Sequence, residues 1–231
     1  MFLFKKKKIV LDCFTSEQGI ADLFPISSLK RNPPNWWKSF SNTTPIDGCP
    51  VEFSTIKRCP GIRDLFIEAF CIPAWSEYKL YKDPVQGFSH IGPNRYAEGN
   101  VHQQTQLGPQ YSDYVHFKFL SPWFLKQKHE MKWMMMQPFW HGNTDILLPP
   151  GILEFKHQHS THINIISKKE SEFKEYNFSA GDPLAYLVPL TESKIEIKTH
   201  VVDQTELQKL KTFHHSFHNS YELTRKRKNN E

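Results

Sequence analysis

The sequence predicts a mainly β protein, a two-sheet β-sandwich or jelly roll with a short helix near residues 60–69 and an amphipathic C-terminal helix. Its 231 residues suit one large β-rich domain. Aromatic residues make up 14% of the chain, and 16 prolines are scattered along it, which disfavours long helices and favours short strands joined by stiff loops. We expect the β domain over residues 1–202, with a Pro- and Trp-rich N-terminal segment, and the helix with a disordered basic tail over residues 203–231.

The formal net charge of +5 comes from two short tracts, KKKK at residues 5–8 and RKRK at residues 225–228. Without these tracts the acidic residues outnumber the basic ones, so the body offers no basic face for nucleic acid. A weak contact between the basic tail and nucleic acid is the only such contact that the composition predicts.

Cysteine usage and hydropathy indicate a protein that stays inside a cell or inside a particle assembled there. The cysteines at positions 13, 49, 59 and 71 form no Cys-x-x-Cys pair, and we expect buried free thiols in a reducing compartment. The opening MFLF is too short for a secretory signal. No apolar run reaches the ~20 residues that a membrane span needs, so we expect no membrane contact.

Short elements follow one another in the first third of the chain. Residues 8–15 (KIVLDCFT) begin with β-branched side chains and alternate, which predicts a strand. Residues 16–24 predict a short helix, and residues 31–40 (RNPPNWWKSF) an extended loop, because two prolines restrict its backbone. Residues 59–70 (CPGIRDLFIEAF) carry apolar side chains at helical spacing behind a proline, which predicts the helix near residues 60–69.

The middle of the chain predicts strands on either side of a polar stretch. Residues 70–81 predict a strand with an edge or bulge at its proline. Residues 82–110 are polar and form either a long surface loop or a wide hairpin with weak strands. Residues 114–125 alternate clearly, and Pro122 is expected to end or bend this strand. Residues 131–140 are apolar on both faces, which predicts a strand covered on both sides, and residues 145–150 predict a short strand.

The C-terminal segment differs in kind. Residues 203–221 carry leucine and aromatic side chains at steps of three or four, the pattern of an amphipathic helix packed on the sheet or on a partner. Asp203 and Glu206 stand where a capping pair would begin it.

Residues 151–164 (GILEFKHQHSTHIN) are the one stretch where spacing predicts a chemical site. In a continuous strand His157 and His159 share one inward face with apolar side chains, and His162 lies opposite unless a bulge turns it inward. Neutral imidazoles two residues apart can bind one metal ion in a dry pocket, so the three histidines predict a divalent ion, Fe, Mn, Ni or Zn. The alternative is that they are hydrogen-bonded histidines of the core or its rim.

Two halves of this region resemble the motifs of the cupin superfamily. Gly151, His157 and His159 match the spacing of the first motif, and FSAGDPLAYLVP is similar to the glycine turn and strand of the second. The resemblance implies a jelly-roll barrel and, as one hypothesis, a metal-dependent enzyme such as an Fe(II) oxygenase or an isomerase. The positions where cupins carry their remaining ligands hold other residues here: Ile163, Asn164 and Leu184.

A broader resemblance covers about two thirds of the chain. The ordered segments PNWWK, TIKRCPGIRDLF, HFKFLSPWFLK and YNFSAGDPLAYLVPL are similar to an uncharacterised protein family that is common in tailed phages of marine bacteria. The resemblance implies a phage or bacterial origin, a β-sandwich-like core and no established activity. It also implies a place in the host cytoplasm or the virion.

Three functions follow, in this order. The first is a non-enzymatic phage protein, virion-associated or a small binding module, whose partner is a protein or the phage particle. The second is the metal-dependent cupin-type enzyme. The third is a carbohydrate-binding module, because jelly rolls often present tryptophan faces to sugars; the candidate aromatic residues are Trp36, Trp37, Trp75 and Trp123.

Overall fold

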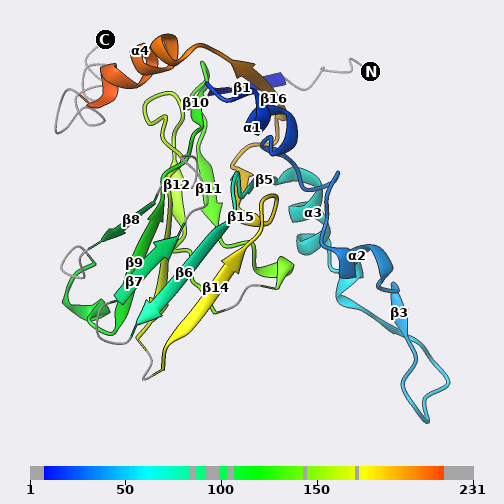
Figure 1. Ribbon diagram of the computed structural model, residues 1–231. Coiled ribbons are helices and arrows are strands. Elements are labelled where there is room, and N and C mark those ends of the chain that lie inside the picture. Colours follow the sequence, from blue (N-terminus) through cyan, green and yellow to red (C-terminus); the bar gives the residue numbers. More distant parts are fainter. Residues whose placement is uncertain are drawn as a thin grey trace, which may run out of the picture.

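A computed structural model describes residues 8–83, 87–91, 99–102, 107–142, 145–169 and 172–215. The described chain is mainly β, with several sheets and few helices (Figure 1). This confirms the predicted fold class at that level. No helix in the described part of the chain is both long and apolar enough to cross a membrane.

Two three-stranded antiparallel sheets pack face to face (Figure 1). One contains β7 (Gly87–Ile91), β6 (Tyr78–Asp83) and β14 (Lys174–Phe178), and the other contains β8 (Gly99–His102), β9 (Tyr114–Phe119) and β13 (Ile163–Lys168). Every second side chain of β6 and β9 is buried, as a strand with one inward face requires. The ring of Phe119 joins the two sheets, because its centroid lies 4.8 Å from that of Tyr78 and 5.4 Å from that of Phe178.

A five-stranded antiparallel sheet continues this core. Its strands in order are β12 (Gly151–Leu153), β11 (Trp133–Met136), β15 (Pro183–Pro189), β5 (Phe70–Pro73) and β2 (Ser27–Ser28). One face contributes Trp133, Met135 and Leu187 to the main core, and the other buries Cys71 and Tyr186 in a second apolar cluster. Met136 of β11 is half-buried against this second cluster, so the strand is covered on both sides as predicted, but it spans only residues 133–136 of the predicted 131–140.

A third three-stranded sheet brings the start of the chain beside residues near its end. It contains β10 (Phe124–Lys126), β1 (Lys8–Thr15) and β16 (Lys194–Val201), and β1 pairs with β16 in parallel along its whole length. The two flanking helices are α1 (Gln18–Leu23) and α4 (Gln204–His215). The strand at residues 8–15 and the helix within residues 16–24 are confirmed.

The other helical elements are short. They are α2 (Asn35–Ser39), α3 (Pro60–Glu68), η1 (Ile56–Arg58), η3 (Pro109–Tyr111) and η4 (Phe139–His141). Helix α3 confirms the helix predicted near residues 60–69, and its Phe66 is buried against the five-stranded sheet. Between α2 and η1 a small hairpin, β3 (Thr43–Thr44) and β4 (Phe53–Ser54), projects from the body (Figure 1).

The amphipathic C-terminal helix is confirmed over the residues that the structure describes. Asp203 begins α4: its carboxylate accepts a hydrogen bond from the Glu206 amide (2.8 Å), and its carbonyl accepts one from the Leu207 amide (2.9 Å). Leu207 is buried. Residues 216–221 of the predicted helix and the basic tail at 225–228 lie outside the described residues, as do residues 5–7.

Several predicted boundaries are wrong, for identifiable reasons. Residues 114–125 divide into two strands, β9 and β10, because Ser121 and Pro122 interrupt the alternation, at the proline that was expected to end or bend the strand. Residues 70–81 likewise divide into β5 and β6, with the buried Trp75 between them. The predicted loop over residues 31–40 contains α2. The described part of the polar stretch 82–110 contains β7 and β8, which pair with β6 and β9 and not with each other, so it is neither a plain loop nor a single wide hairpin. Of the cysteines expected to be buried, Cys59 is exposed and Cys49 half-buried, although all four thiols are free.

Candidate functional site

The histidine segment does not form the continuous strand that the sequence predicted. Strand β12 ends at Leu153, and the Glu154 carbonyl accepts hydrogen bonds from the amides of His157 (3.0 Å) and Gln158 (2.9 Å), which closes a tight turn. Burial still alternates as predicted, and the buried side chains are Phe155, His157, His159, Thr161, Ile163 and Ile165. Because the backbone turns, buried side chains two residues apart do not all face the same part of the core.

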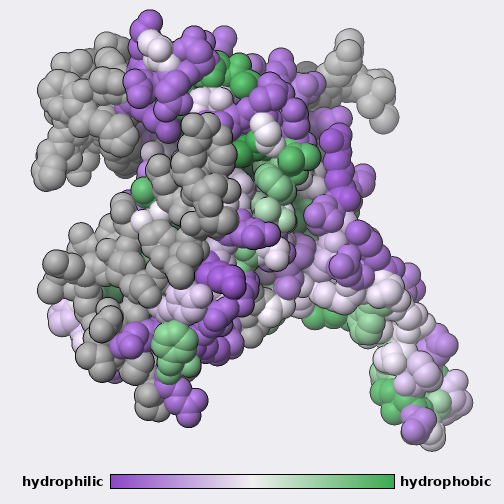
Figure 2. All heavy atoms as spheres, in the orientation of Figure 1, coloured by the Kyte–Doolittle hydropathy of each residue, from purple (hydrophilic) through white to green (hydrophobic). Residues whose placement is uncertain are grey.

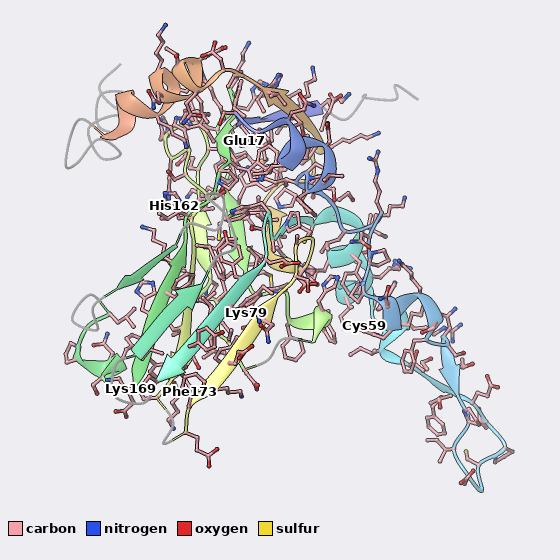
Figure 3. The ribbon with its side chains drawn as sticks, in the orientation of Figure 1. Glu17, Cys59, Lys79, His162, Lys169 and Phe173 are labelled. Atoms are coloured by element: carbon pink, nitrogen blue, oxygen red, sulfur yellow. The ribbon has the colours of Figure 1, made fainter. Side chains whose placement is uncertain are left out.

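Each of the three histidines has a partner of its own. The His157 Nε2 lies 3.7 Å from the Glu154 carboxylate. The His159 ring stacks on Phe124 (4.6 Å between centroids) and its Nδ1 lies 2.7 Å from the Leu125 carbonyl. The half-buried His162, labelled in Figure 3, accepts a hydrogen bond at Nδ1 from the Ser121 amide (3.0 Å).

The structure does not bring these histidines together as ligands. Within the described ranges no group of three or more His, Cys, Asp or Glu side chains is placed to hold a metal ion. The contacts of His159 and His162 are those of hydrogen-bonded core and rim histidines, the alternative that the sequence left open.

The four candidate tryptophans lie in different surroundings. Trp75 and Trp123 are buried in the main core. Trp37 packs edge-on against Phe66 (4.5 Å between centroids) in the second apolar cluster. Trp36 lines a groove of about 680 Å³, so it is the aromatic candidate that a ligand can reach.

Three segments far apart in the chain form this groove, which we call the Trp36 groove. The first is the Pro-Pro turn and the start of α2, the second is η4 with the residues that follow it, and the third is the turn between β14 and β15. The polar lining side chains are Asn32, Asn35, His141, Asp145, Asn177 and Asp182. Trp36 and Phe178 supply its aromatic surface.

Hydrogen bonds fix the turn between β14 and β15. Gly181 has a φ of 94°, a left-handed conformation that favours glycine, and its amide donates to the Ala74 carbonyl (2.8 Å). The Asp182 carboxylate accepts a hydrogen bond from the Ser179 amide (2.7 Å), and the Asp182 carbonyl accepts one from the Ala74 amide (2.7 Å). The turn predicted at GDP is confirmed, and it holds Asp182 at the wall of the Trp36 groove.

Trp36 is held in one orientation before any ligand binds. Its indole Nε1 donates to the Trp140 carbonyl (2.7 Å). Its ring contacts those of Trp37 (5.6 Å between centroids), Phe40 (6.0 Å) and Trp140 (5.9 Å). Rigid positioning of this kind lowers the entropy that a ligand would otherwise lose on binding.

His141 reaches from the groove to a buried tyrosine. Its Nδ1 lies 2.6 Å from the Tyr186 hydroxyl. Burial raises the pKa of Tyr186, and nearby Cys71 raises it further, so the phenol keeps its proton. Burial also lowers the pKa of His141, although Asp182 opposes that shift. When Tyr186 donates to Nδ1, the neutral imidazole carries its own proton on Nε2.

Asp182 gives the Trp36 groove a negative charge, while the charge of Asp145 is offset by its ion pair with Lys174. Asp182 and Asp145 both line it, and Lys174 donates to the Asp145 carboxylate (2.7 Å), which lowers the pKa of that aspartate. No Lys or Arg side chain of the described residues lines the groove. The Trp36 groove therefore does not suit phosphate or nucleic acid, whose binding requires basic groups.

Sequence reasoning found Trp36 but missed His141, Asp182 and Tyr186. Asp182 lies inside the recognised GDP turn, but only the folded turn shows that it faces a groove. His141 precedes Gly142, whose φ is 92°, so the pair His-Gly after two aromatic residues was the available signal of a tight turn. Tyr186 could not be paired with His141 from the sequence, because 45 positions separate them.

Acidification is expected to weaken the fold through His141. Its pKa in the folded chain lies below the ordinary 6.5, so below about pH 6.5 the unfolded chain binds the proton more readily. The contribution of neutral His141 is complete above that pH and is lost as the pH falls toward the folded pKa. The free energy of unfolding, measured by urea denaturation between about pH 8 and pH 5, should fall more steeply in the wild type than in His141→Phe. Parallel curves would contradict the assignment.

Comparison with protein-family models and with curated proteins finds no match to this chain.

Proposed function

We propose that the protein is a non-enzymatic binding module whose ligand is a neutral carbohydrate held in the Trp36 groove. The observation that carries the proposal is the lining of the groove: an oriented indole beside amide, carboxylate and imidazole groups, without a basic side chain among the described residues. Sugars combine apolar C–H faces with many hydroxyls, so an aromatic face next to planar hydrogen-bonding groups matches their chemistry.

The polar groups of the groove can form hydrogen bonds with the hydroxyl groups of a sugar. Asn35 and Asn177 are exposed and each offers a donor and an acceptor. Asp182 accepts the Ser179 amide on one carboxylate oxygen, Oδ2, and Oδ1 is the second acceptor. Neutral His141 presents an N–H when Tyr186 donates to its other nitrogen. Together the carboxylate and the amides can hydrogen-bond neighbouring sugar hydroxyls, and these hydrogen bonds require no charge on the ligand.

A phage particle is the setting that we propose for this module, with a jelly-roll scaffold. The support for the setting is the ordered set of motifs shared with the marine phage family, and the support for the scaffold is the face-to-face packing of the two three-stranded sheets. Co-sedimentation of the protein with purified virions tests the setting. Its absence from virions would restrict the proposal to the free module.

Replacing Trp36 by alanine is expected to weaken sugar binding by about tenfold or more, because an aromatic residue at the centre of a site commonly contributes over 1 kcal/mol. A glycan array with neutral and acidic oligosaccharides identifies the strongest ligand, and isothermal titration of that oligosaccharide measures the loss. Asn35→Ala tests the same groove without removing a packed ring, since Asn35 is exposed.

Phe173→Ala is the matched control. Phe173 is also an exposed aromatic residue, but it lies at the lower end of the sandwich in Figure 3 and does not line the groove. A blank array, or equal affinities in wild type, Trp36→Ala and Asn35→Ala, would remove the proposal. Release of reducing ends from the bound oligosaccharide would show that the groove is catalytic and would overturn the non-enzymatic assignment.

A further inference from the structure

The projecting hairpin carries an apolar surface that the rest of the chain leaves uncovered. We call residues 40–56 the arm; it contains β3, β4 and the loop between them. Five of its large apolar side chains are 43–63% exposed: Phe40, Ile46, Val51, Phe53 and Ile56. Figure 2 shows apolar residues gathered at the end of the arm, away from the body. Contiguous exposure of this kind marks a protein contact.

The arm has a defined shape in spite of its exposure. β3 pairs with β4 through Thr43 and Ser54 and through Thr44 and Phe53, and the Thr43 hydroxyl donates to the Glu52 carboxylate. At its base the Thr55 hydroxyl donates to the Ser41 carbonyl (2.6 Å). In the described chain β3 and β4 pair only with each other, so the outer edges of both strands keep free backbone groups.

A groove on the body has the complementary features. It measures about 820 Å³ and is bordered by β2, the end of α3, the turn before β16, and β16 itself. Among the described strands, β2 and β16 are the end strands of their sheets. Apolar side chains of the wall include Ile26, Ile67, Phe70, Ile195 and Ile197. We call this the edge groove.

Charge distinguishes the edge groove as the place where the arm fits. The arm contains Asp47 and Glu52 and no Lys or Arg. Lys30, Arg31 and Lys194 line the edge groove, and the negative charge of Glu68 and Glu192 offsets only part of theirs. The other acidic residue of the wall, Glu196, is bound to Lys8 (2.6 Å). Two arms packed on each other would instead bring like charges together.

We propose that the arm docks in the edge groove of a second copy of this chain, adding its strands to the free edges there. The arm of the same chain extends away from the body, while β1 and β16 lie at the other end of the molecule (Figure 1). The contact is therefore between copies. Because the two surfaces are different, it is heterologous, and repetition builds a ring or an open filament. This inference does not involve the Trp36 groove.

Association is measured by sedimentation velocity over a series of protein concentrations. The wild type is expected to gain mass with concentration. The double variant Val51→Ser, Phe53→Ser should raise the dissociation constant by about tenfold or more, since two apolar contacts are removed from the interface. Ile152→Ser is the control, because Ile152 is 56% exposed on β12 and borders neither the arm nor the edge groove. Circular dichroism verifies that each variant is folded.

Disulfide trapping identifies the surfaces in contact. Cys59, exposed at the base of the arm (Figure 3), is first replaced by serine. Cys49 on the arm is then the one native cysteine that is not buried, since Cys13 and Cys71 are buried. Adding Ser193→Cys in the edge groove and a mild oxidant should give dimers and higher oligomers on a non-reducing gel, and Cys49→Ser should abolish them. A monomer at every concentration would overturn the proposal. So would Cys49–Cys49 dimers without the introduced cysteine, which would show that arms pack on arms.

Discussion

Replacing Gln127 by leucine is expected to destabilise the folded chain by about 3–5 kcal/mol. Gln127 is buried and polar, and every hydrogen-bonding group of its amide has a defined role. Its Oε1 accepts the indole N–H of Trp133 (2.7 Å), and its Nε2 donates to the carbonyls of His129 and Met131 (both 2.8 Å). Leucine fills a similar volume but leaves one donor and two acceptors without these partners.

The loss is measured as a shift in the urea midpoint. Gln18→Leu is the matched control, because the amide of Gln18 bonds Asp22 on the surface of α1 (2.9 Å), where water replaces the lost hydrogen bond. A double-mutant cycle with Trp133→Phe separates the indole contact from the two carbonyl contacts. If Gln127→Leu and Gln18→Leu destabilise equally, the buried network contributes nothing beyond packing.

Local rules predicted the parts of this fold that local chemistry controls. The strand at residues 8–15 and helix α3 follow from alternation and helical spacing, and Gly181 marks the turn before β15. These features depend on side chains within a few positions of one another, so the sequence carries enough information to place them.

The features of the fold that were not predicted depend on contacts between residues far apart in the sequence. The parallel pairing of β1 with β16 joins residues almost 190 positions apart, and no periodicity encodes it. The alternation of residues 155–165 correctly predicted which side chains are buried, but the Glu154 carbonyl turns the backbone. Burial at every second position is therefore compatible with a turn, and it cannot establish that His157 and His159 face the same point.

The candidate site also combines a residue that local sequence predicts with residues that only distant contacts bring together. Trp36 could be singled out because a Pro-Pro pair followed by two tryptophans is a local pattern. The groove beside it is assembled from three separate segments, so the roles of His141 and Asp182 appear only once those segments meet. Because its lining residues are scattered along the chain, no single motif marks this groove. The histidine-rich segment, whose residues are adjacent in sequence, was therefore predicted as the site instead.

Gly99→Ala is expected to destabilise the fold by about 2–3 kcal/mol, the upper part of the range for overpacking a core. A Cβ added at Gly99 would lie 2.2 Å from Cζ of the Phe117 ring, closer than a real Cβ atom approaches another heavy atom. Phe117 has no exposed surface and its ring contacts that of Phe119 (5.0 Å between centroids). The ring cannot withdraw without disturbing the core shared by the two three-stranded sheets.

Thermal and urea unfolding of Gly99→Ala and Gly61→Ala, compared with the wild type, test this assignment. At Gly61, on α3, an added Cβ meets nothing within 4 Å, so alanine there should leave stability unchanged or raise it by about 0.5–1 kcal/mol. Phe117→Leu removes the ring atoms that an alanine at position 99 would strike. The double variant should therefore lose less stability than the sum of the two single variants. Strict additivity would mean that the Gly99 backbone, and not the ring contact, determines the effect.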